Sequence, residues 1–347
     1  MLDVFPVIKL LTITSLCFLL GFIWAPAYIK FLKKIKFGKS IRDSATAPIA
    51  AQLHAAKAGT PTGGGVVIWL TVVCVTLILS IGCVIGNSTL CSWNFLSRAQ
   101  TLLPLGALIA AALVGLLDDY LNVKRIGPHG GGLRMRHRLL SYAFIALGGA
   151  WWFFSKLEWD VLHVPFYGNY NLGWVYILVF VFVIIATSFS VNETDGLDGL
   201  AGGPLMAAFA AYAVIAFSQG KIELSIFCAA IVGALMAFLW YNVPKAAFFM
   251  GDTGSMSLGT VLGVVAMLTN QPLLLPLIGL PFVIETVSVI IQVISKKIFK
   301  KKFFKSAPLH HHLEASGWNE PQIVFRTWII SLFCAGLGVV LALIDRF

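Results

Sequence analysis

Residues 102–120 read LLPLGALIAAALVGLLDDY, a long apolar run that ends in two adjacent carboxylates, Asp118 and Asp119. A membrane-spanning helix needs roughly 20 predominantly apolar residues. Backbone groups inside a bilayer must also be satisfied within their own segment, which favours a helix. The run therefore predicts a transmembrane helix whose acidic end emerges at a membrane surface. Acids at such a boundary are costly when unpaired, and they indicate a functional site.

The same pattern recurs along the 347 residues, of which 59% are hydrophobic and 12% charged. This composition excludes an ordinary soluble domain. We expect an all-α, polytopic integral membrane protein that forms a single transmembrane catalytic domain over residues 1–347. About ten spans are predicted on apolar length, at residues 7–29, 66–86, 102–117, 139–155, 173–190, 203–218, 223–241, 257–269, 273–295 and 326–344.

Basic residues predict how the chain is oriented. Most of the 25 Lys and Arg residues fall in the loops that follow the odd-numbered spans. The positive-inside rule makes that side cytoplasmic and leaves both termini periplasmic. Because the first run lacks a small-residue cleavage site and is followed by a basic segment, we expect a retained anchor rather than a signal peptide.

The net charge of +10 indicates a membrane-surface protein. Such a charge would hold the anionic headgroups of membrane lipids and attract an anionic substrate. Nucleic acid is not an expected partner, because no basic domain stands apart from the apolar runs. The six cysteines lie mostly inside the runs without CxxC spacing, so they are interpreted as small apolar residues and no disulfide is assigned.

Three acidic motifs lie at the ends of apolar runs that face the same predicted side: LLDDY, NETDGLDG at 192–199 and FMGDTGS at 249–255. Asp195 and Asp198 share a side if their segment is helical, and Asn192 offers both a donor and an acceptor. Mg²⁺ is held by one or two carboxylates plus substrate phosphates, a role that suits Asp252. The alternatives are polar turns or a Ca²⁺ loop, although the Ca²⁺ loop's twelfth-position Glu is missing. Together the motifs predict a cytoplasmic-face Mg²⁺ site.

Three further features are candidates for the same site. The loop at 306–326 reads SAPLHHHLEASGWNEPQIVFR, and its adjacent histidines favour phosphate contacts over zinc, whose ligands are usually spaced. KAGTPTGGG at 57–65 suggests a phosphate-gripping loop but is no Walker A motif, because its Lys precedes the glycines. Glu285 lies near the middle of the predicted ninth span, and either pairs with a neighbour or belongs to the site.

Together KAGTPTGGG, LLDDYLNV, NETDGLDGLAGG, FFMGDTGS and APLHHHLEASGWNEPQIVFR resemble the polyprenyl-phosphate N-acetylhexosamine-1-phosphate transferase superfamily. The string PLHHHLE at 308–314 is similar to its muramoyl branch. The resemblance implies a bacterial inner-membrane enzyme with ten spans that often forms a homodimer. Such an enzyme transfers phospho-N-acetylmuramoyl-pentapeptide from UDP-N-acetylmuramoyl-pentapeptide to undecaprenyl phosphate. The products are UMP and lipid I, the first lipid-linked peptidoglycan precursor, and the reaction requires Mg²⁺.

The resemblance also implies residue roles. Asp252 resembles the Mg²⁺ ligand, and Asp118 and Asp119 resemble a catalytic pair near the lipid phosphate. Substrate binding is implied for Lys57, Thr62, Asn192, Asp195, Asp198, Asn242, Phe249, Gln292, His310, His311 and His312. One departure is Asn122, which stands where the muramoyl branch usually has Lys.

Two alternatives to this function stay open. A sibling transferase would act on UDP-N-acetylglucosamine. A proton- or cation-coupled transporter would also need intramembrane acids, but its coupling carboxylates lie near the midplane. Only Glu285 lies so deep in the predicted spans.

Overall fold

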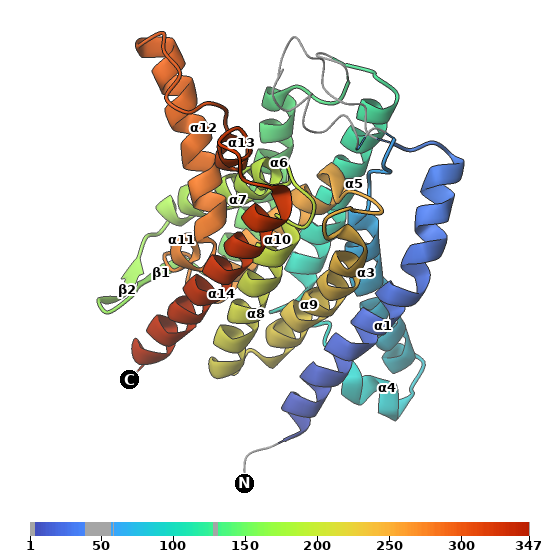
Figure 1. Cartoon of the computed structure of the whole chain (residues 1–347). Helices are drawn as coiled ribbons and strands as arrows, with labels where there is room; N and C mark the ends of the chain where they lie inside the picture. The colour runs from blue at the N-terminus through green and yellow to red at the C-terminus, as the bar shows by residue number, and fades with distance from the viewer. Residues whose placement is uncertain (1–3, 39–56, 58, 128–130, 347) are drawn as a thin grey trace.

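A computed structural model describes residues 4–38, 57, 59–127 and 131–346 as a mostly helical protein (Figure 1). The helices are α1 (Phe5–Lys34), α3 (Gly65–Val84), α4 (Ser88–Trp93), α5 (Leu102–Val123), α6 (Met135–Lys156), α7 (Val175–Thr194), α8 (Gly202–Ser218), α9 (Ile222–Asn242), α10 (Gly251–Leu268), α11 (Leu275–Ile278), α12 (Leu280–Ile298), α13 (Leu309–Glu314) and α14 (Glu320–Ile344). Each predicted span falls on one or two of these helices.

Six helices are long and apolar enough to cross a membrane, namely α1, α3, α5, α7, α9 and α14. The protein is therefore a multi-pass membrane protein, while the count of ten spans stays a prediction. The expected single helix over 273–295 is wrong, because α11 ends at Ile278 and α12 begins at Leu280. Gly279 separates the two helices, and Pro281, which has no backbone N–H, opens α12.

The all-α prediction misses a β-hairpin. β1 (Val161–Val164) pairs antiparallel with β2 (Gly168–Asn171), with Val161 opposite Asn171. Gly168 has a φ of +97°, which suits a tight turn. The hairpin lies near the C-terminus, at the end of the molecule opposite the basic end of α12 (Figure 1). It was missed because strands of four residues are too short to give a periodic signal.

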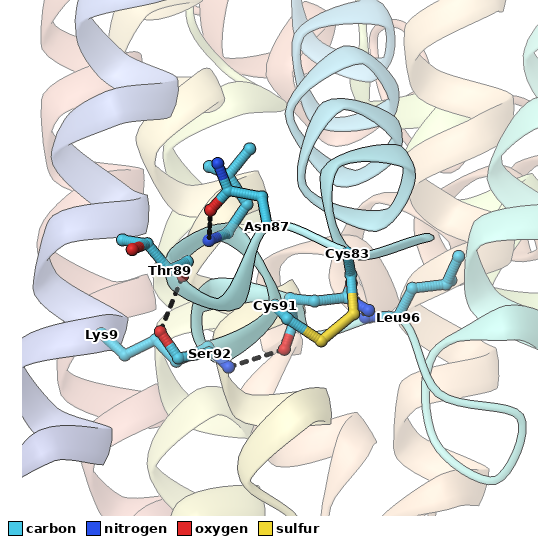
Figure 2. Close-up of a disulfide and its surroundings, with 9 residues drawn as sticks. Lys9, Cys83, Asn87, Thr89, Cys91, Ser92 and Leu96 are labelled. Atoms are coloured by element: carbon cyan, nitrogen blue, oxygen red, sulfur yellow. Dashed lines mark hydrogen bonds between the residues drawn. A yellow bond between two sulfur atoms is a disulfide. The ribbon is translucent and has the colours of Figure 1, made fainter. Parts of the chain in front are cut away.

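A disulfide joins Cys83, in the last turn of α3, to Cys91 in α4 (Figure 2). The interpretation of all six cysteines as apolar residues is therefore wrong for this pair. Asn87 caps α4 by accepting a hydrogen bond from the Leu90 amide, which folds the chain back between the two cysteines. Disulfides persist in oxidising compartments, which agrees with the periplasmic side predicted for this end.

Helix α10 is buried along almost its whole length and packs against α5 and α7. Its approach to α5 depends on Gly115. A Cβ atom at this position would lie 2.3 Å from the carbonyl oxygen of Asp252. Small residues let membrane helices approach closely, so Gly115 brings the acidic end of α5 beside Asp252.

We expect Gly115→Ala to lower the stability of the folded protein. The added methyl group must push α5 away from α10, and overpacking of this kind typically costs about 1–3 kcal/mol. Gly106→Ala is the matched control, because nothing lies within 4 Å of a Cβ at that position of the same helix. Thermal unfolding in lipid nanodiscs measures both variants. Equal melting temperatures would contradict the close contact.

Candidate active site

The two carboxylates at the end of α5 are both buried, and they point to different partners. Asp118 Oδ1 accepts the Leu133 amide at 2.6 Å. Asp119 accepts the amides of Asp252 and Thr253 at 3.1 Å each, and Thr62 donates its hydroxyl to Asp119 at 3.3 Å. Asp119 thus caps the N-terminus of α10, where unpaired amides favour an acid. Of the pair, Asp119 binds backbone amides of the FMGDTGS motif, whereas Asp118 pairs with the side chain of Arg138.

Arg138, near the start of α6, lies between Asp118 and Asp252. Its Nε is 2.6 Å from Asp118 Oδ2, and its Nη2 is 3.0 Å from Asp252 Oδ2. Its Nη1 donates to Asn192 Oδ1 at 3.2 Å. Sequence reasoning did not single out Arg138, because RMRHR at 134–138 has several equivalent basic residues. We call Asp118, Arg138, Asn192 and Asp252 the carboxylate cluster.

Asn192 completes this cluster from the end of α7. Its Nδ2 donates to Asp252 Oδ1 at 2.7 Å and to Ser255 Oγ at 2.9 Å. Each oxygen of Asp252 therefore meets a different neighbour, which fixes the orientation of the carboxylate. The structure thus brings together residues from all three acidic motifs, although the motifs are separated by up to 134 residues along the chain.

A second polar cluster lies around Asp198. Lys57 Nζ is 2.7 Å from Asp198 Oδ1 and 2.5 Å from Glu320 Oε1. Glu320 also accepts the Asp198 amide at 2.7 Å, and Asp198 Oδ2 accepts the Ala246 amide at 3.0 Å. Glu320 was not predicted, because an acid at the start of a helix usually has a purely local role. Here it holds two predicted site residues in place.

His310 is buried, and it resolves the alternatives left open for Glu285. Its backbone amide and its Nδ1 lie 3.2 Å and 3.1 Å from Glu285 Oε2. Its Nε2 faces Gly196, where a Cβ atom would come within 2.2 Å. Glu285 therefore pairs with a predicted substrate-binding residue, and the Nδ1 contact turns the other ring nitrogen toward the NETDGLDG segment.

The two neighbouring histidines have other partners. His311 Nδ1 is 2.8 Å from Glu314, and His312 Nδ1 accepts the Lys305 amide at 3.1 Å. Across the described part of the chain, no three His, Cys, Asp or Glu side chains converge as a metal cage requires.

The remaining predicted substrate-binding residues shape loops at this end. Asn242 accepts the Gly199 amide at 2.9 Å and donates to the Phe248 carbonyl at 2.8 Å. Gln292 similarly bonds the backbone of Phe303 and Phe304. Phe249 pairs through its backbone with Pro61 and Gly64, and Asp195 is the half-buried residue that ends α7. Their direct contact with substrate stays a prediction.

The carboxylate cluster fits a divalent cation by the chemistry of its donors. Mg²⁺ prefers carboxylate oxygens together with phosphates and water. Asp118 and Asp252 already face one shared cation, the guanidinium of Arg138. The buried carboxylate of Asp118 and the half-buried carboxylate of Asp252 both lie close to this point, so positive charge is required between them.

Comparison with known proteins defines the family. Residues 101–270, which include the whole carboxylate cluster, match the model of Glycosyl transferase family 4. The phospho-N-acetylmuramoyl-pentapeptide-transferase of Geobacillus sp. (strain WCH70) is 41% identical over 325 residues, covering 93% of this chain and 95% of that protein. The chain belongs to the phospho-N-acetylmuramoyl-pentapeptide-transferase family. Proteins of the same name from Bacillus anthracis and Bacillus mycoides (strain KBAB4) are each 40% identical over 333 residues, covering 95% of this chain and 97% of the relatives.

Membership of the phospho-N-acetylmuramoyl-pentapeptide-transferase family confirms the resemblance drawn from the five sequence motifs. The protein is a transferase of peptidoglycan synthesis, and its long apolar helices can cross a bacterial membrane. The transporter alternative is excluded by near full-length similarity to these enzymes.

Proposed function

We propose that the protein transfers phospho-N-acetylmuramoyl-pentapeptide from its UDP carrier to undecaprenyl phosphate, forming lipid I and releasing UMP. The reaction would use Mg²⁺ at the cytoplasmic face of the inner membrane. The observation that best supports this proposal is that Asp118 and Asp252 both pair with the guanidinium of Arg138. The names of the relatives support the muramoyl substrate over UDP-N-acetylglucosamine.

In this reaction an oxygen of the lipid phosphate attacks the β-phosphorus of the UDP-sugar. The bond between the β-phosphorus and its bridging oxygen breaks, and UMP leaves. Phosphoryl transfer depends mainly on positioning and charge neutralisation. Bound Mg²⁺ would neutralise charge on the diphosphate. Asp252 would hold the ion, and Asp118 would accept a proton from the lipid phosphate.

The nucleotide would lie toward Lys57, Asp198 and His310. Glu285 orients His310 and favours the tautomer protonated on Nδ1. The opposite nitrogen then accepts from a hydroxyl group or, in the charged ring, donates to a phosphate oxygen. Glu285 would therefore act on the substrate through His310, as a positioning residue.

We expect Glu285→Gln to lower kcat/KM for the UDP-sugar by about 10- to 100-fold, as when outer partners of a site histidine are lost. Gln keeps the size of the side chain but removes the charge that orients His310. Glu223→Gln, in the first turn of α9, is the matched control. Because a general loss of folding would also lower activity, melting temperatures are measured alongside. Unchanged kcat/KM in a folded variant would remove Glu285 from the site.

The proposed reaction is tested with purified protein in lipid nanodiscs that contain undecaprenyl phosphate. Release of labelled UMP is followed with UDP-N-acetylmuramoyl-pentapeptide and, in parallel, with UDP-N-acetylglucosamine. We expect release only with the first, and its loss when excess EDTA removes Mg²⁺. Turnover of UDP-N-acetylglucosamine instead would assign the sibling reaction, and full activity in EDTA would rule out the metal. The homodimer stays a prediction that mass photometry of the same particles checks.

A further inference from the structure

An open cavity of about 460 Å³ lies at the end of the molecule opposite the carboxylate cluster. The β-hairpin, the end of α10, the beginning of α9 and the end of α14 line it. These elements meet near the C-terminus in Figure 1. Its volume is within the usual range for small-molecule sites. The proposed transfer reaction uses no residue of this cavity.

Two amide side chains in the cavity wall have unused acceptors. Gln271 is 4% exposed, and no donor among the described residues reaches its Oε1. The same holds in this part of the chain for Gln219 Oε1, although Gln219 Nε2 donates to the Thr269 carbonyl at 2.8 Å. A buried acceptor without a donor has lost its hydrogen bond to water without a replacement, which is unfavourable. A ligand that brings hydrogen-bond donors would remove this cost.

The formal charges of the side chains that line the cavity cancel. Lys221 and Arg346 are cationic, and Glu158 and Asp345 are anionic. Lys221 Nζ already donates to the Leu268 carbonyl at 2.7 Å, and Asp345 is engaged by His163 and by the Phe166 amide. A cavity with no net formal charge does not favour an ion of either sign. It favours an uncharged ligand that carries its own donors and acceptors.

The wall is also pre-formed and contains an aromatic surface. The His163 amide donates to Asn270 Oδ1 at 3.0 Å, which ties the hairpin to the end of α10. Within the hairpin, the His163 ring lies 2.8 Å from Asn169 Oδ1. Trp159 lines the cavity and donates its indole N–H to the Val161 carbonyl. Aromatic rings provide rigid apolar surface beside such polar groups.

We infer that this cavity is a carbohydrate-binding site. Hydroxyl groups both donate and accept hydrogen bonds, so a sugar can satisfy Gln219 and Gln271 while accepting from Lys221. Lys221 Nζ lies over the Trp159 ring, 5.1 Å from its centroid, so a sugar that accepts from Lys221 also lies beside the indole. By the orientation proposed from the basic loops, the site opens to the outer side of the membrane, away from the transferase site.

The test uses the full-length protein in phosphatidylcholine nanodiscs, because detergents with sugar headgroups would compete. Binding of N,N′-diacetylchitobiose, maltose and sucrose is measured by saturation-transfer NMR and calorimetry. We expect at least one to bind, and Gln219→Met and Gln271→Met each to weaken that binding at least tenfold. Thr89→Ala, on exposed α4 at the same end, should bind as the unaltered protein does. All three variants should keep transferase activity, which separates this result from any failure of the proposed reaction.

Three outcomes would overturn the inference. No binding of any of the three sugars at roughly 10 mM, an affinity near the weak limit of specific recognition, would leave a cavity filled by water alone. Sugar binding that is unchanged in both Gln219→Met and Gln271→Met would place the sugar at another site on the protein. Salt-sensitive binding of glycerol phosphate in place of the sugars would make this an anion site. If Gln271→Met does not fold, the half-buried Gln219→Met alone decides the test.

Discussion

Asp252→Asn is expected to abolish transfer while leaving the fold intact. In the folded protein, Asp252 Oδ1 accepts from Asn192 and Oδ2 faces Arg138. An amide keeps one acceptor oxygen but places its N–H donor opposite the donor of Asn192 or of Arg138, and it removes the charge that would hold Mg²⁺. Loss of a group that stabilises developing charge typically costs about 10²- to 10³-fold in kcat. Because the metal site would be lost as well, we expect a fall at the upper end of this range or beyond.

The measurement is release of labelled UMP by purified Asp252→Asn at saturating Mg²⁺. Asp160→Asn is the control, since this acid lies next to the β-hairpin, away from the carboxylate cluster. Both variants are first checked for the melting temperature of the unaltered protein. Wild-type rates from folded Asp252→Asn would exclude Asp252 from the reaction.

Arg138→Gln is expected to lower both stability and transfer. The variant leaves the buried carboxylate of Asp118 and the half-buried carboxylate of Asp252 without their shared cation. Removing one partner from a buried ion pair costs about 3–5 kcal/mol. Arg138→Lys should be intermediate, because an ammonium group keeps the charge but cannot bridge two carboxylates with a planar fork. We also expect added Mg²⁺ to raise the melting temperature of Arg138→Gln more than that of the unaltered protein, since the divalent ion restores the missing charge.

Arg136→Gln is the matched control for this variant. It removes the same charge from an exposed position two residues away on α6. Thermal unfolding across a Mg²⁺ titration gives a readout that does not depend on turnover. If Arg138→Gln melts and turns over like Arg136→Gln, Arg138 is not the counter-ion of the cluster.

Much of the helical architecture follows from local composition. Apolar runs of span length can satisfy their backbones only as helices, so each predicted span falls on helix. The failures have local causes as well. The break at Gly279 interrupts a run that is apolar on both sides, and the hairpin of β1 and β2 is too short for a periodic signal. The bond between Cys83 and Cys91 depends on the turn that Asn87 makes after α3.

The site was predictable as a set of motifs and not as a set of contacts. The acidic motifs lie at the ends of alternate spans, which all reach the same membrane surface. The sequence therefore predicted that Asp118, Asn192 and Asp252 belong to one site. The partners Arg138 and Glu320 were missed because their side chains are long and charged. Such side chains can reach several acids, and which one they meet depends on how the helices are rotated. Adjacent residues on a helix differ in direction by about 100°, but that alone did not distinguish the roles of Asp118 and Asp119.

The amino-acid sequence by itself determined that this chain is a multi-helix membrane protein of the phospho-N-acetylmuramoyl-pentapeptide-transferase family, since apolar length and motif order are properties of the chain alone. Tertiary structure decided that Asp119 caps α10 while Asp118 meets Arg138, and that Glu285 orients His310. These pairings join residues from separate helices. Close packing at glycines such as Gly115 sets the distances between those helices, and a few ångströms decide whether two charges stabilise each other or remain apart.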